Sequence, residues 1–141
     1  MKIYIASSFD PLSDRVLKVC EALEKEGHKV LVKWWLRTEL RDKRNILSRE
    51  DFYSEPMCKI MYERDKLGVD NADILVFVAS EEILSYNGAI AELGMAMERG
   101  IPCICIGNLK NSAMYFPLYW VNSISELIQK ISELKETYSI A

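Results

Sequence analysis

Two carboxylates in the middle of the chain have the residue type and the surroundings for work on a glycosidic bond. Glu92 stands in the run YNGAIAELGMAMERG (86–100), among small and apolar residues. A helix that starts at Asn87 and Gly88 would favour an ionised carboxylate in its first turn or just after it. Asp65 stands in ERDKLGVDNADILVF, near the end of a predicted helix that leads into a strand. Cleavage of a glycosidic bond needs one carboxylate at the anomeric carbon and one group at the departing base, and these two residues could divide that work.

Each carboxylate also has an ordinary structural explanation. An acidic residue near the start of a helix complements the helix dipole and stabilises the helix by about 0.3–1 kcal/mol, which would be sufficient reason for Glu92. Asp65 could be a solvated residue of its helix. The small residues Gly88, Ala89 and Ala91 leave space in which a ligand could approach Glu92. Spacing alone therefore leaves the catalytic and the structural interpretations open.

Strands and helices are predicted to alternate along the 141 residues. Apolar runs predict strands at 2–6, 29–35, 73–79 and 102–107, with a short fifth strand within 118–122. Apolar residues three and four positions apart predict helices at 14–27, 56–72, 86–100 and 123–138. The residues expected on one face of the second helix are Met57, Ile60, Met61 and Leu67. Residues 36–55 lack a clear period and are predicted to be irregular. This alternation indicates one domain, 1–141, with a parallel sheet covered on both faces.

The loops that follow the first four strands are the places to search for a site. Parallel sheets of this kind bind ligands beyond the carboxyl ends of their strands, where the strand order reverses. The residues expected to contact a substrate there are Ser7, Ser8, Trp34, Ser85, Tyr86, Asn87 and Gly88. A base could stack on Trp34 or on Trp35, or one tryptophan could be core and the other surface. The basic run at 40–45 could meet a phosphate as a lid, or be a solvated loop.

Three blocks of sequence point to a known family. They are IYIASSF, RDKLGVDNADILV and GAIAELGMAMERGIPCICI, and a shorter block, NSAMYF, follows them. Together they cover most of the chain, to about Pro117, and the most specific part is the x-ELG-x-A core. The chain resembles the nucleoside 2-deoxyribosyltransferase superfamily, and within it the 2′-deoxynucleoside 5′-monophosphate N-hydrolases. The resemblance implies a doubly wound, flavodoxin-like sheet of about five strands, and cleavage of the bond between a deoxyribose and a base.

The resemblance also implies roles for individual residues. Glu92 would attack the anomeric carbon, and Asp65 would assist at the base. Tyr4, in the first strand, would lie near both carboxylates, and Ser8 would help to hold the sugar or the phosphate. These roles make Glu92, Asp65 and Tyr4 the expected catalytic residues.

A neighbouring subunit is expected to complete the site. In the family the segment that corresponds to Ser112 and Met114 reaches into the site of another subunit, which implies at least a homodimer. A serine at position 112 suits a phosphate, whereas the transferases tend to have an asparagine there. The expected substrate is therefore a small nucleotide or nucleoside, with a preference for the nucleotide.

The chain departs from the family pattern at two places. Six residues before the glutamate the family has an aspartate or a serine, whereas this chain has Tyr86, preceded by Ser85. Either Ser85 replaces that contact through a shifted loop, or the contact is missing. The phosphate loop of the hydrolases, rich in glycine and arginine, is replaced by SFDPLSDR. Asp10 would be a poor neighbour for a phosphate, and the sequence leaves open whether Arg15 reaches one.

Composition excludes several other classes of function. The formal net charge of −3 gives no support for binding a nucleic acid polymer, and no run approaches the roughly 20 apolar residues that cross a membrane. The first strand begins at Lys2, which leaves no room for a signal peptide, so a cytoplasmic protein is expected.

Cys103 and Cys105 are expected to be reduced core thiols on one face of a strand, and the single histidine, His28, is expected to be a surface residue. No metal or organic cofactor is expected.

The leading hypothesis is an N-glycosidase that hydrolyses a 2′-deoxynucleoside 5′-monophosphate with Glu92 as the nucleophile. The close alternative is a transferase that passes the deoxyribosyl group to a second base. A third interpretation is a TIR-like domain that binds or cleaves NAD or another nucleotide, since IYIASSF, the two tryptophans and the late ELG are also compatible with that class. A catalytically inactive binding module is a fourth.

Overall fold

The computed structural model describes residues 1–8, 13–36, 43–80, 87–108 and 118–137, and within them five strands form one parallel sheet. The strands are β1 (Lys2–Ala6), β2 (Lys29–Leu31), β3 (Ile74–Val78), β4 (Cys103–Ile106) and β5 (Leu118–Val121). Their order is β2-β1-β3-β4-β5, and every neighbouring pair is parallel. The chain moves outward from β1 to β2 and then returns past β1 to β3, so the strand order reverses between β1 and β3. The predicted doubly wound, flavodoxin-like fold is confirmed.

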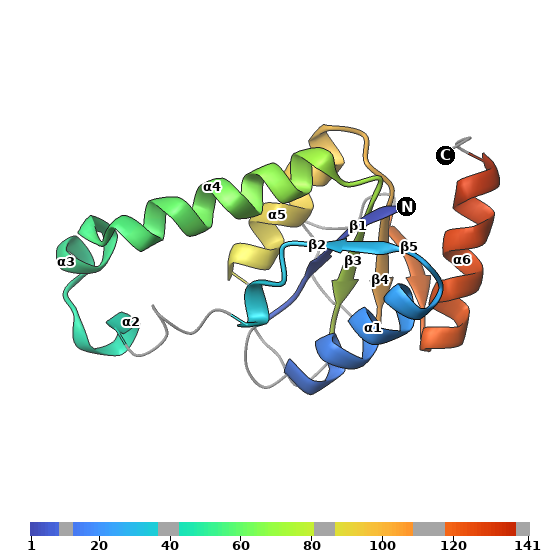
Figure 1. The fold of residues 1–141 in the computed structure, drawn as a ribbon, viewed down its shortest axis with the longest axis horizontal. Coiled ribbons are helices and arrows are strands. Elements are labelled where there is room, and N and C mark those ends of the chain that lie inside the picture. Colours follow the sequence, from blue (N-terminus) through green and yellow to red (C-terminus); the bar gives the residue numbers. More distant parts are fainter. Residues whose placement is uncertain (9–12, 37–42, 81–86, 109–117, 138–141) are drawn as a thin grey trace.

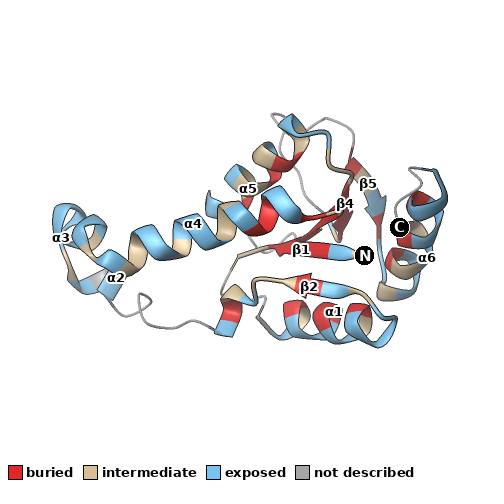
Figure 2. Cartoon of the chain, turned by 45° about the horizontal axis from the view of Figure 1, so that its top comes forward, coloured by how far each residue is buried: buried red, intermediate tan, exposed pale blue. Residues whose placement is uncertain are grey.

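Helices cover both faces of the sheet (Figure 1). The long helices are α1 (Ser13–Lys25), α4 (Pro56–Asn71), α5 (Asn87–Glu98) and α6 (Ile124–Thr137). Buried residues of α1 and α6 share one apolar cluster with alternate strand residues, and those of α4 and α5 share the cluster on the opposite face. The three inner strands β1, β3 and β4 are buried along almost their whole length, whereas the edge strands β2 and β5 are partly exposed (Figure 2). Each face therefore has its own core, and the face under α4 and α5 holds the candidate residues.

Helix α4 contacts the sheet only near its end. Its buried residues are Gly68 and Val69, whereas Ile60 and Leu67 are 39% and 61% exposed. The predicted helix is confirmed, and none of the four apolar residues expected on one face of it is buried. For the residues of its first half the reason is that α4 extends beyond the sheet toward α3 (Figure 1), whereas Leu67 is exposed next to the buried Gly68. Apolar residues in that first half do not report a contact with the core.

The second strand is shorter than predicted. It ends at Leu31, because Val32 adopts a left-handed backbone conformation with φ of 52°. The N–H of Trp34 then donates to the carbonyl of Val32 at 2.8 Å, and Trp34–Leu36 forms a 3-10 helix, η1. Both tryptophans that were predicted to lie at the end of the strand therefore lie in a turn beyond it.

Residues 36–55, which were predicted to be irregular, contain two short helices. Helix α2 spans Lys43–Ile46 and helix α3 spans Arg49–Ser54. Together with the first turns of α4 they form an arm that projects from one side of the sheet, as both views of the chain show (Figures 1 and 2).

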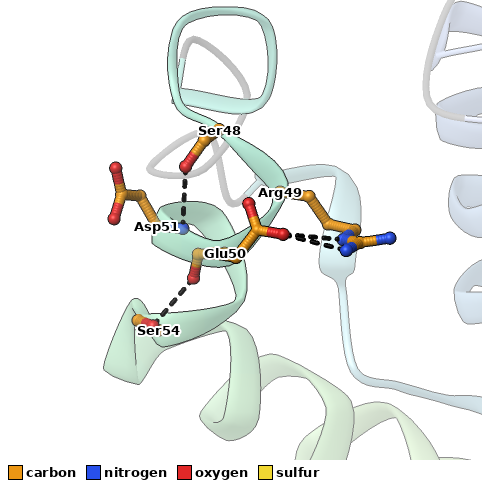
Figure 3. A network of polar contacts seen from close by, with 5 residues as sticks. All are labelled: Ser48, Arg49, Glu50, Asp51 and Ser54. Carbon is orange, nitrogen blue, oxygen red and sulfur yellow. Dashed lines mark hydrogen bonds and ion pairs between the residues drawn. The ribbon is translucent and has the colours of Figure 1, made fainter.

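Local polar contacts explain why α3 forms without an apolar period. The hydroxyl of Ser48 accepts a hydrogen bond from the N–H of Asp51 at 3.1 Å and caps the start of the helix (Figure 3). The hydroxyl of Ser54 donates to the carbonyl of Glu50 at 2.7 Å, and Arg49 pairs with the Glu50 carboxylate at 2.9 Å. The serine followed by two acidic residues was a helix start signal that the apolar pattern did not reveal.

Two predictions about single residues can be compared with the fold. Cys103 and Cys105 are free, buried and on the α5 side of β4, which confirms them as core thiols of one strand face. His28 is half-buried rather than fully at the surface, and its Nδ1 lies 3.3 Å from the amino group of Met1. Among the described segments, no helix has the length and apolar character needed to cross a bilayer.

Candidate active site at the switch point

Side chains fasten the carboxyl end of β1 to its surroundings at the point where the strand order reverses. The hydroxyl of Ser7 donates to the carbonyl of Val78, in β3, at 2.7 Å. The indole Nε1 of Trp34 donates to the carbonyl of Ile5, in β1, at 2.7 Å. Trp35, whose ring meets Trp34 edge-on at 5.4 Å, is buried in the core. Ser7 and Trp34 therefore lie at the edge where sheets of this topology bind their ligands.

Tyr4 lies in the middle of β1 with no solvent exposure. Its side chain belongs to the cluster that also contains Val69 of α4 and Ala89 and Leu93 of α5. The Tyr4 hydroxyl oxygen is itself buried. A tyrosine is a large polar residue for the centre of a parallel strand, and its ring is directed to the face that carries both candidate carboxylates.

Glu92 lies in the second turn of α5, between the buried residues Ala89 and Leu93. Helical side chains lean toward the start of the helix, and Oε1 of Glu92 lies 4.0 Å from the position that a Cβ on Gly88 would take. The residue as a whole is half-buried, and its other oxygen, Oε2, is buried. The missing side chain at Gly88 thus leaves open space beside a partly desolvated carboxylate near the positive end of a helix dipole.

Asp65 lies on α4, three residues before Gly68 and four before Val69, and it is half-buried. These spacings place it on the same side of the helix as the two residues that pack on the sheet. Helix α4 ends where β3 begins, so residues earlier in the helix lie toward the carboxyl edge. Because α4 also contacts α5, the structure brings Asp65, Glu92 and Tyr4 to one face of the sheet from three different elements.

Arg15 extends from the first turns of α1 across the ends of β3 and β4. Its Nη1 donates to the carbonyl of Ala79 at 2.8 Å, and its Nη2 lies 3.2 Å from the Cβ position of Gly107. Gly107 has φ of 106°, and a Cβ there would collide with the Ala79 carbonyl oxygen. A glycine is therefore required for this close approach, and the sequence could not show that the guanidinium reaches the carboxyl edge.

The remaining predicted residues are only partly described. Ser8 is half-buried at the last described position of its loop, and Asn87 and Gly88 are the first two residues of α5. The predicted residues Ser85, Tyr86, Ser112 and Met114 lie outside the described residues.

The described part of the chain offers neither a thiol nucleophile nor a metal centre near this edge. Burial raises the pKa of the Cys103 thiol to about 12. Burial also raises the pKa of Cys105 to about 12, although the Arg15 guanidinium acts in the opposite direction. Both thiols therefore remain protonated at neutral pH. Within the described residues, no group of three or more His, Cys, Asp or Glu side chains could hold a metal ion.

Comparison with solved structures shows that this fold is shared with other proteins. No protein-family model matches the sequence, and no curated protein matches it. The 2-deoxyribosyltransferase of the psychrotolerant bacterium Bacillus psychrosaccharolyticus superposes with a TM-score of 0.70 at 20% identity, over 90% of each chain. The CMP N-glycosidase BcmB of Clostridium botulinum superposes with a TM-score of 0.55 at 13% identity, over 94% of this chain and 99% of that one. At these identities the likeness establishes a shared fold over nearly the whole chain.

Proposed function

We propose that the chain is an N-glycosidase that hydrolyses the base–sugar bond of a 2′-deoxynucleoside 5′-monophosphate. The observation that carries the proposal is that β1, α4 and α5, the elements of Tyr4, Asp65 and Glu92, pack against one another on one face of the sheet, next to the β1–β3 switch point. Two neighbours of the same fold act on related compounds, one as a 2-deoxyribosyltransferase and the other as an N-glycosidase of CMP.

The reaction would proceed in two steps through a glycosyl ester. A carboxylate oxygen of Glu92 attacks C1′ while the bond from C1′ to the base nitrogen breaks, and the bonding electrons leave with the base. The carboxyl group of Asp65 gives its proton to the departing base. In the second step Asp65 takes a proton from water, the water oxygen attacks C1′, and Glu92 is released as a carboxylate. The products are the free base and deoxyribose 5-phosphate.

Tyr4 would orient the nucleophile. Its hydroxyl oxygen and Oε2 of Glu92 are both buried on the same side of the sheet, where a hydrogen bond to a carboxylate is stronger than in water. A hydroxyl that donates to Glu92 would hold one carboxylate oxygen and leave the other directed at C1′.

Arg15 supports a substrate that carries a 5′-phosphate. Its guanidinium is held at the carboxyl edge by the Ala79 carbonyl, close to the loop that contains Ser7 and Ser8. Arginine and hydroxyl groups are common donors to phosphate oxygens. The sugar is proposed to be deoxyribose because a 2′-hydroxyl would crowd Glu92 next to C1′.

Transfer of the deoxyribosyl group to a second base is the other candidate function. The specific observation in its favour is the higher TM-score, 0.70, of the 2-deoxyribosyltransferase fold. The glycosyl ester on Glu92 would be the same in both reactions, and only the acceptor in the second step would differ.

We further propose a homodimer in which Ser112 of the partner subunit and Met114 of the partner subunit complete each site. Large apolar side chains on the projecting arm support an association, since Ile46 and Tyr53 are 79% and 72% exposed. Exposed apolar surface of this kind commonly marks an interface between proteins.

A chromatographic screen of nucleosides and 5′-monophosphates, each with and without a second free base, tests the proposal. We expect free base and deoxyribose 5-phosphate from a deoxynucleotide, whereas a new nucleotide would indicate transfer. Glu92→Gln should reduce the rate at least about 10³-fold, because it removes the nucleophile. Glu98→Gln, on an exposed position of the same helix, should leave it unchanged. Undiminished base release by Glu92→Gln would rule out the mechanism.

A further inference from the structure

We propose that Val32 and Gly68 form a clamp that fixes the ring of Tyr4, which makes them positioning residues for the reaction. The inference rests on the proposed function for its catalytic consequence, although the clamp itself is a property of the fold. Neither residue was among those that the sequence indicated. Both lie beyond direct reach of the reacting atoms, and they would act through the tyrosine.

Gly68 is the first half of the clamp. A glycine inside a helix destabilises the helix relative to alanine, so the presence of Gly68 in α4 needs a reason. A Cβ on Gly68 would lie 3.0 and 3.1 Å from Cδ2 and Cε2 of the Tyr4 ring, and 2.6 Å from Cγ2 of Val32. The helix therefore approaches the ring so closely that only a glycine fits between them. Gly94, in α5, has no such neighbour within 4 Å.

Val32 is the second half of the clamp. Its φ of 52° is rare for a β-branched residue and is energetically unfavourable. The turn is held by the hydrogen bond from the N–H of Trp34 to the Val32 carbonyl, and by the bond from the Trp34 indole to the Ile5 carbonyl. The strained residue is thus tied to β1, the strand that carries Tyr4. Val32 packs against the cluster to which Tyr4 belongs, and its Cγ2 and the Tyr4 ring both lie next to the Cβ position of Gly68.

Val32 and Tyr4 differ in the space into which each could move if a side chain were added at position 68. Val32 and Gly68 both line an open groove of about 430 Å³ between the end of β2 and α4, so that the valine has space beside it. The Tyr4 ring is fully buried and has none. A methyl group added at position 68 would therefore press on Tyr4 unless Val32 gave way. Removal of the Val32 side chain should create the room that the methyl group needs.

A double-mutant cycle tests the clamp. In the otherwise wild-type chain, Gly68→Ala should lower kcat about tenfold with KM changed less than about twofold, because a small displacement of a catalytic group costs rate rather than binding. In a Tyr4→Phe chain, which has no hydroxyl to misplace, the same substitution should lower kcat less than about twofold. Gly94→Ala is the matched control. Equal losses in both backgrounds would mean that Gly68 serves only stability, and would overturn the proposal.

A second readout does not depend on turnover. In protein labelled with ¹³Cζ-tyrosine, the Tyr4 signal is identified by its loss in Tyr4→Phe. This signal should shift in Gly68→Ala, return toward its original position in Gly68→Ala/Val32→Ala, and stay in place in Gly94→Ala. If Gly68→Ala does not fold, Val32→Ala alone should shift the signal, because it loosens the clamp. An unmoved Tyr4 signal would refute the clamp. Absence of base release by the wild-type protein would refute only the proposed function.

Discussion

At the scale of single residues, the position of Glu92 has an electrostatic consequence. A carboxylate loses hydration when it is partly buried, and one oxygen of Glu92 is buried between Ala89 and Leu93. An ordinary surface glutamate would avoid that loss. A bound substrate would explain why the carboxylate is partly buried, because a sugar in the adjacent space left by Gly88 would lie against it.

That space can be filled in steps by substitution. A Cβ on Gly88 would lie 4.0 Å from Oε1 of Glu92, which is an ordinary van der Waals distance, so Gly88→Ala should change kcat/KM less than about twofold. Gly88→Leu should lower kcat/KM at least about tenfold, because the larger side chain occupies the route to C1′. Steady-state kinetics with thermal melting of both variants would check this. Equal activity of the alanine and leucine variants would show that the substrate does not approach there.

Arg15 should distinguish nucleotides from nucleosides. Arg15→Met keeps the apolar stem but removes the guanidinium, so we expect KM for a 5′-monophosphate to rise at least about tenfold. KM for the corresponding nucleoside should change less than about twofold, because it has no phosphate to lose. Lys18→Met, on an exposed position of the same helix, is the control. A parallel rise for both substrates would place the phosphate elsewhere.

At the scale of elements, a helix or strand was predicted accurately where its apolar residues are buried against the sheet. In α1, the apolar residues whose spacing predicted the helix at 14–27 are buried against the sheet, and they include Val16, Val19 and Leu23. The three inner strands β1, β3 and β4 were equally plain from their apolar runs, because they are buried on both sides. The end of β2 could not be predicted, because the left-handed residue there is Val32 and not the glycine that usually indicates such a turn. The apolar pattern of α4 did not show which face of the helix contacts the sheet, because the first half of the helix packs on no part of the sheet.

The turn between α1 and β2 should make stability depend on pH. Burial, assisted by the Met1 amino group and by Lys135, lowers the pKa of His28 below its usual value near 6.5. Above pH 6.5 the residue is neutral in both states and has no effect. As the pH falls below 6.5, the unfolded chain binds a proton at His28 before the folded chain does. The free energy of unfolding therefore decreases until the pH reaches the lower pKa of the folded state.

We therefore expect His28→Gln to reduce the fall in Tm between pH 7.5 and pH 5. The measurement is a series of thermal melts of both chains in matched ionic strength. The difference between the two curves isolates the histidine from the many carboxylates that titrate in the same range. Parallel curves for the two proteins would show that His28 titrates alike in the folded and unfolded states.

At the scale of the whole molecule, the fold could be predicted almost completely, and the site only in part. Alternating elements and apolar strands define the sheet, and the sheet places the helices that carry Asp65 and Glu92 on the same face. Sequence spacing could not show the reach of Arg15 or the close approach of Gly68 to Tyr4, because these depend on packing between elements that are distant along the chain. Contacts of that kind have no periodic signature.

The exposed apolar residues of the arm predict the assembly. We expect sedimentation velocity to show a dimer, and Tyr53→Glu to shift the population toward monomer by introducing a charge into an apolar interface. Tyr119→Glu, on a half-exposed position at the far edge of the sheet, is a control for added charge. A wild-type protein that remains monomeric at high micromolar concentration would contradict the prediction.

The position of the arm in the chain also determines how the molecule could be divided. The arm separates β1, α1 and β2 from all later elements, yet β1 lies inside the sheet with β3 as its partner. A break in the peptide between α2 and α3 would leave Tyr4 on one fragment and Asp65 and Glu92 on the other. Each fragment would be inert alone, and mixing them would restore turnover through strand pairing, so this chain would lend itself to fragment complementation.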